Sequence, residues 1–63
     1  MKIKDFLKLY SEVSCFINVY DTSTYQTKTY HYIQDVVRDY GYFPVVSWKL
    51  ELSSLRIETR TEF

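Results

Sequence analysis

The stretch that decides the fold runs from residue 46 to residue 59 and reads Val46-Ser47-Trp48-Lys49-Leu50-Glu51-Leu52-Ser53-Ser54-Leu55-Arg56-Ile57-Glu58-Thr59. Apolar and polar side chains alternate along both halves of it, which is typical of two half-buried β-strands. The sequence therefore predicts a β-hairpin whose two-residue loop is Ser53-Ser54.

This loop sets which residues face each other across the hairpin. On one face the predicted partners are apolar or β-branched: Leu52 with Leu55, Leu50 with Ile57, and Trp48 with Thr59. On the other face the predicted partners carry opposite charges: Glu51 with Arg56, and Lys49 with Glu58. Each such charged pair contributes roughly 0.2–1 kcal/mol, and a slip of one residue would destroy both patterns.

The earlier part of the chain predicts two helices and a first hairpin. Apolar residues at helical spacing predict a helix from Ile3 that ends between Tyr10 and Val13, and a second helix over residues 30–40. Alternating residues predict strands over 14–20 and 25–29, joined by a polar turn at 21–24 whose Asp and Ser side chains bond nearby backbone amides.

The boundaries of the second helix carry their own signals. Thr29 is the expected N-cap, and Gly41 follows the last periodic residue, where a left-handed C-cap favours glycine. Pro44 prevents the helix from continuing. The element order is therefore α-β-β-α-β-β. The predicted fold is a single α+β domain over residues 1–63, in which a four-stranded antiparallel sheet carries both helices on one face.

The composition of the chain narrows its function classes. Eight basic residues balance eight acidic ones, which argues against both a nucleic-acid binder and an acidic mimic of nucleic acid. The single cysteine, Cys15, allows no internal disulfide and fits a reducing cytoplasm. No apolar run approaches the roughly 20 residues of a membrane span, so no membrane association is expected.

The sequence shows no catalytic machinery, and we expect no enzyme activity, cofactor or metal. His31 is the one histidine, and the nearby Asp35 is the only partner that helical spacing offers it. One Cys and one His do not make a zinc site, and a single glycine cannot form a phosphate-binding loop. Asp35 and Asp39, four residues apart, are expected to face water.

Tyrosine is the unusual feature, with seven in 63 residues. Tyr10 and Tyr40 fall on apolar helix faces and are assigned to the core. Four others lie on polar segments and are predicted to bind a partner protein, because Tyr gives large contact area at low entropic cost: Tyr25, Tyr30, Tyr32 and Tyr42. Two alternatives are open, namely that these rings patch the rim of a thin core or that they stack on single-stranded nucleic acid.

Three segments resemble a group of short orphan proteins encoded by phages and integrated elements of Gram-positive bacteria: Met1–Leu7, Ile17–Asp21 and Val46–Glu58. Anti-CRISPR proteins are similar in size and in their lack of motifs. The resemblance implies a non-enzymatic binder that inhibits or modulates a host protein, including a CRISPR defence effector, by occupying its surface. A further expectation, from the exposed second strand, is a self-assembling homodimer.

Overall fold

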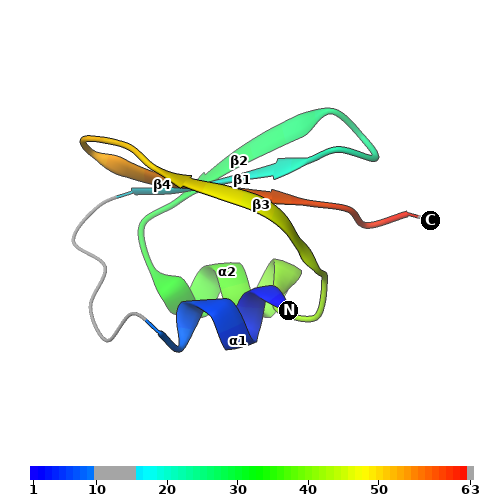
Figure 1. Cartoon of the computed structure of the whole chain (residues 1–63), viewed down its shortest axis with the longest axis horizontal. Helices are drawn as coiled ribbons and strands as arrows, with labels where there is room; N and C mark the ends of the chain where they lie inside the picture. The colour runs from blue at the N-terminus through cyan, green and yellow to red at the C-terminus, as the bar shows by residue number, and fades with distance from the viewer. Residues whose placement is uncertain (10–15, 63) are drawn as a thin grey trace.

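A computed structural model describes residues 1–9 and 16–62. The elements follow the predicted order of types: α1 (Ile3–Leu7), β1 (Phe16–Asp21), β2 (Gln26–Tyr30), α2 (Ile33–Tyr40), β3 (Val45–Leu50) and β4 (Ser54–Thr59). The four strands form one sheet, and both helices lie on the same side of it (Figure 1). The predicted α+β class is confirmed. No helix in the described part of the chain is long and apolar enough to cross a membrane.

The sheet is mixed, and the predicted fully antiparallel arrangement is wrong. Its strand order is β2-β1-β4-β3, with two antiparallel hairpins whose inner strands, β1 and β4, pair in parallel. The cause is α2, which spans about 12 Å at 1.5 Å per residue and carries the chain back along the sheet (Figure 1). β3 therefore starts at the same end as β2, and β4 then runs in the direction of β1.

The core lies between the two helices and the two central strands. Alternate residues of β1 and β4 point toward the helices, as the alternation predicts. The buried apolar side chains of the described residues are Ile3, Phe6, Leu7, Ile17, Val19, Val36, Leu55 and Ile57. Such a small set leaves little redundancy, so each member matters to stability.

The second hairpin forms, but its predicted register is wrong by two residues. Leu50 opposes Leu55 and Trp48 opposes Ile57, and the Glu51 amide donates to the Ser54 carbonyl at 2.8 Å. The two-residue loop is therefore 52–53. The predicted charge pairs are lost, because Lys49 now faces Arg56 and Glu58 faces Ser47. Arg56 instead forms an ion pair with Glu58 on its own strand, at 3.6 Å.

Contacts outside the hairpin set this register. The Ser53 carbonyl accepts a hydrogen bond from the Phe16 amide of β1 at 3.2 Å. At the other end of β4, the buried hydroxyl of Thr59 donates to the Pro44 carbonyl at 2.7 Å, and a bulge lies between Val45 and Ser47. A shift of two residues keeps every side chain on its face, so the alternation itself cannot reveal it.

Several predicted boundaries also move. α1 ends at Leu7, before the predicted limit, and the assignments for Tyr10 and Cys15 lie outside the described residues. α2 starts at Ile33 with Tyr32 as its N-cap residue. Thr29 is not the cap because it belongs to β2, where its hydroxyl donates to the Asn18 side chain of β1 at 2.8 Å.

Gly41 ends α2, but for a different reason from the one predicted. Its φ of −55° is right-handed, so the expected left-handed C-cap is wrong. A β-carbon at this position would lie 2.4 Å from the Val37 carbonyl oxygen, which no side chain tolerates. The Gly41 carbonyl also accepts a hydrogen bond from the Lys4 amide at 2.9 Å. Glycine is needed here for a close approach within the last turn.

Asp21 closes the first hairpin, as the turn chemistry predicts. Its carboxylate is buried, accepts the Ser23 amide at 2.9 Å and accepts the Thr61 hydroxyl. Burial raises the pKa of Asp21, but hydrogen bonds from Thr61, Ser23 and Thr24 together outweigh it and hold the pKa below its ordinary value of 3.8. This carboxylate joins the β1–β2 turn to the segment after β4.

We expect Ile57→Ala to lower the free energy of unfolding by about 2–5 kcal/mol, because it leaves a cavity in the centre of the core. Urea unfolding followed by circular dichroism measures this. Thr27→Ala, on the exposed edge strand, is the matched control and is expected to change stability by less than about 0.5 kcal/mol. Equal effects of the two substitutions would contradict the assigned core.

Asp21→Asn is expected to flatten the loss of stability in acid. Because the folded-state pKa of Asp21 is lowered, its ionisation stabilises the fold above pH 3.8, and this contribution is lost as the pH falls through the folded value. Unfolding measured from neutral pH down to about pH 3 tests the slope. Asp5→Asn, at a half-exposed carboxylate, is the control. An acid slope in Asp21→Asn equal to that of wild type would refute the assignment.

Candidate functional site

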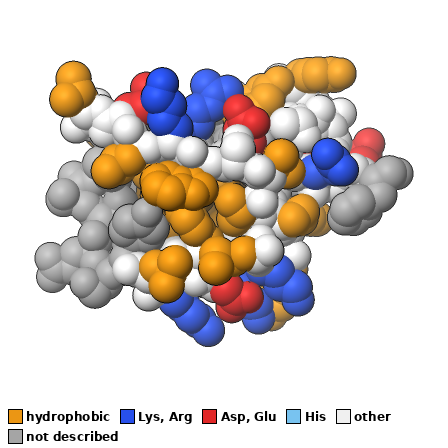
Figure 2. Space-filling view, in the orientation of Figure 1, with side chains coloured by type: hydrophobic (Ala, Val, Ile, Leu, Met, Phe, Trp, Pro, Cys, Tyr) orange, Lys and Arg blue, Asp and Glu red, His pale blue; other side chains and the backbone are white. Residues whose placement is uncertain are grey.

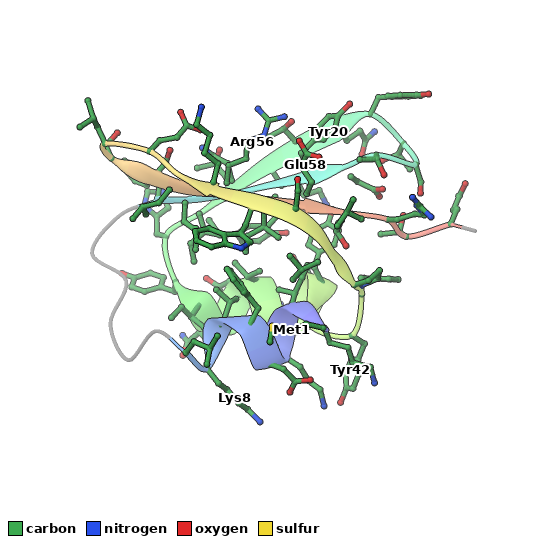
Figure 3. All side chains as sticks on the ribbon, in the orientation of Figure 1. Met1, Lys8, Tyr20, Tyr42, Arg56 and Glu58 are labelled. Carbon is green, nitrogen blue, oxygen red and sulfur yellow. The ribbon has the colours of Figure 1, made fainter. Side chains whose placement is uncertain are left out.

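The four tyrosines predicted to bind a partner do not form one surface. Tyr25 lies in the β1–β2 turn at a left-handed φ of 60° and is exposed. Tyr32 is exposed at the start of α2. Strand β2, about 17 Å long at 3.3 Å per residue, lies between Tyr25 and Tyr32. Tyr42 is exposed after α2, at the far end of that helix from Tyr32 (Figure 3). A flat partner surface would not meet all of them together.

Tyr30 has a structural role. It opposes the buried Ile17 across the β1–β2 ladder and is only partly exposed. Its ring meets that of Tyr40 edge-on at 6.3 Å, and its hydroxyl donates to Asp39 Oδ2 at 2.8 Å. Burial, followed by the hydrogen bond and charge of Asp39, raises the pKa of the Tyr30 hydroxyl. Tyr30 thus joins β2 to α2, as the rim interpretation expects.

The isolated histidine has no catalytic partner in the described residues. The ring of His31 packs edge-on against that of Phe16 at 4.7 Å. Asp35 instead forms an ion pair with Arg38 at 3.6 Å. Within residues 1–9 and 16–62, no three His, Cys, Asp or Glu side chains gather closely enough to hold a metal ion.

The face of the sheet without helices is polar, and several of its side chains pair with one another. Arg56 lies over the ring of Tyr20 at 5.2 Å and forms its ion pair with Glu58 (Figure 3). A shallow groove of about 380 Å³ crosses the second hairpin, and its lining includes charges of both signs. These contacts balance charge within the chain, so this face offers no strong attraction for a highly charged ligand.

The largest apolar exposure lies along β3 and the loop that follows it. Trp48, Leu50 and Leu52 have exposed fractions of 52%, 62% and 110%. Trp48 and Leu50 oppose buried residues of β4 and so share the helix-side face. The ring of Trp48 packs on that of Phe6 from α1 at 5.5 Å, with half of its surface still open. In the space-filling view, hydrophobic side chains gather between β3 and α1 (Figure 2).

The backbone of β3 adds a second feature, because β3 is an edge strand. Its first residues are covered: the Val45 amide donates to the Met1 carbonyl at 2.8 Å, and the Ile3 amide donates to the Phe43 carbonyl at 2.9 Å. Farther along, Glu51 points its amide at β4, so by antiparallel alternation Trp48 and Leu50 point their amides and carbonyls outward. The open part of the edge coincides with the exposed apolar side chains.

We call the side chains of Trp48, Leu50 and Leu52, together with the outward backbone groups of Trp48 and Leu50, the β3 edge surface. The sequence predicts alternating strands here and puts these three side chains on one face of the hairpin, but it does not indicate that this face is exposed. The signal that could have located the surface is the surplus of large apolar residues in β3. One helix of five residues and one of eight cannot cover a sheet of four strands, so some apolar side chains of the sheet stay exposed.

The chain matches no protein-family model, and searches of the curated proteins and of the solved structures give no significant match.

Trp48→Ser is expected to lower the free energy of unfolding by only about 1 kcal/mol, because half of this side chain is already in water. The same substitution removes the largest exposed ring of the β3 edge surface. Urea unfolding beside Ile57→Ala measures the difference. A loss as large as that of Ile57→Ala would show that Trp48 serves the core and not an external contact.

Proposed function

We propose that the protein is a non-enzymatic protein-binding module that acts by occupying the surface of another polypeptide chain, and that the β3 edge surface makes the contact. The observation that carries this proposal is that three exposed apolar side chains lie within five residues whose strand part, at Trp48 and Leu50, also points its backbone groups outward. Isolated exposed apolar residues are ordinary, but an aromatic and two leucines within five residues, beside open hydrogen-bonding groups, favour binding of an extended segment.

The mode of contact follows from the two features together. Backbone amides and carbonyls at Trp48 and Leu50 supply hydrogen bonds to an added strand, whatever its sequence. The side chains supply selectivity, since Trp is among the residues that dominate binding energy when they are desolvated. The partner is therefore expected to contribute a strand with apolar side chains facing the α1 side.

The distribution of charge supports a protein partner over a nucleic acid. Several of the cations that could follow a phosphate backbone are engaged within the chain. Lys2 and Lys4 lie over the ring of Tyr42 at 5.7 and 4.7 Å, Lys8 pairs with Asp5 at 4.0 Å, and Arg56 pairs as described above. Combined with zero net charge, this pattern gives little of the electrostatic attraction on which nucleic-acid binding depends.

The resemblance to short phage proteins extends the proposal to the kind of partner: a protein of the bacterial host, including an effector of CRISPR defence. The four predicted tyrosines stay part of this proposal as secondary contacts, with Tyr25, Tyr32 and Tyr42 the accessible ones.

The test is affinity capture from bacterial lysate, with half of each sample treated with nuclease. Three baits are compared: wild type, Trp48→Ser/Leu50→Ser and Tyr25→Ser/Tyr32→Ser. We expect a protein that resists nuclease and is retained by wild type and by the tyrosine variant, but is lost with the β3 variant.

Two other outcomes would overturn this assignment. Loss only with the tyrosine variant would move the contact surface to the tyrosines. Loss of all captured protein after nuclease treatment would favour the nucleic-acid alternative. Circular dichroism of each bait shows whether the variants are folded.

A further inference from the structure

The two edges of the sheet differ in how well they are protected. On β2, Lys28 opposes the buried Val19 and therefore points toward the helix side, where its Nζ lies 5.9 Å from the ring centre of Tyr40. An inward-pointing charge at the middle of an edge strand is a device that blocks pairing with another sheet. On β3 the helix-side residues at the open edge are Trp48 and Leu50, which are apolar and do not prevent another strand from pairing there. Self-association through the second strand is thus disfavoured, and β3 is the edge available.

The charged side chains of β3 indicate what kind of strand would complement its open edge. Lys49 and Glu51 lie on the helix-free side of β3, and neither forms an ion pair in the described part of the chain. Within its own hairpin Lys49 faces Arg56, a like charge, which is unfavourable. A partner strand that brought a carboxylate to Lys49 and a cation to Glu51 would relieve both positions.

A second copy of β3 meets this requirement in one register. We propose that the β3 edge surface pairs with the same surface of a second copy, antiparallel and about a two-fold axis through Leu50, to form a continuous eight-stranded sheet. Lys49 then faces the partner's Glu51, and Glu51 faces the partner's Lys49. Because the pairing is two-fold, the salt bridge forms twice.

The hydrogen-bonding geometry agrees with this register. Trp48 and Leu50 point their backbone groups outward, so they must occupy the hydrogen-bonded positions of the new ladder. With Leu50 on the axis, it pairs with the partner's Leu50, and Trp48 comes level with the partner's Leu52, in the hairpin loop. Lys49 and Glu51 fall at the intervening positions, where opposed side chains approach most closely.

Neighbouring registers are penalised by charge. Because side chains alternate, the pairing can shift only in steps that keep the apolar residues on the helix side. One step in one direction puts Lys49 against the partner's Lys49, and one step in the other puts Glu51 against the partner's Glu51. The residues that strengthen the proposed register therefore exclude the two nearest to it.

The apolar side chains gain cover in the same arrangement. Trp48 already rests on Phe6 of its own α1, and the partner's Leu52 would meet its open half. The start of β3 is closed by Met1 and Ile3, so the contact is confined to residues 48–52. A surface this short is below the roughly 800 Å² per partner of a standard interface, so the dimer is expected to be weak and to depend on concentration.

This inference rests on the proposed function, because both assign protein contact to the β3 edge surface. The inference adds that a second copy of the chain binds to this surface. Sedimentation equilibrium of the purified chain under reducing conditions tests it without any other protein, and the reductant prevents crosslinking through the single cysteine. Four proteins are compared: wild type, Lys49→Glu, Glu51→Lys and the double exchange Lys49→Glu/Glu51→Lys.

Wild type and the double exchange are expected to dimerise, while each single variant weakens dimerisation roughly tenfold or more, because both salt bridges become like-charge pairs. An equimolar mixture of the two single variants is expected to recover dimerisation, since each supplies the charges that the other lacks. Lys49→Glu keeps the fold intact because the new carboxylate faces Arg56 in its own hairpin. The emission of the sole tryptophan, Trp48, is expected to shift to the blue on dimerisation.

A wild-type chain that is monomeric up to millimolar concentration overturns the inference, as does a single variant that dimerises as strongly as wild type. Neither result contradicts the proposed function if capture of a protein from lysate still depends on Trp48 and Leu50. Conversely, a charge-dependent dimer that captures no other protein supports the inference and removes the host-protein proposal.

Discussion

The parallel pairing of β1 with β4 is the constraint on which the other elements depend. It puts Ile17 and Val19 beside Leu55 and Ile57 and so makes one continuous apolar surface from strands at opposite ends of the sequence. Each hairpin alone has too little apolar area to be stable in water. The helices cover this central surface, and the outer strands are left with much of their length exposed. The exposure of β3 is thus a consequence of where the core lies.

The sequence predicts properties that depend on periodicity and misses those that depend on distant contacts. The faces of Ile17, Val19, Leu55 and Ile57 follow from alternation, and all four are buried. The pairing of Leu50 with Leu55 does not follow, because alternation is unchanged by a shift of two residues. The direction of β4 relative to β1 likewise depends on where α2 returns the chain, which no local pattern encodes.

The candidate site shows the same division. Exposure of Tyr25, Tyr32 and Tyr42 agrees with their polar surroundings, but their separation across the molecule depends on the tertiary fold. Trp48 and Leu50 have the pattern of core residues, and only the shortness of the helix layer leaves them open. A small domain with a large sheet therefore exposes large apolar side chains in a pattern that a sequence cannot distinguish from its core.

The central position of β4 has a consequence for synthesis of the protein. Residues 54–59 are synthesised after the other three strands, yet they form one of the two inner strands of the sheet. Until they emerge, β1 has only β2 beside it, and the first residues, 1–3, must wait for residues 43–45. Contacts so distant in sequence slow folding. This part of the nascent chain should therefore stay open until residues 54–59 have emerged, and products truncated before β4 should be cleared by proteases.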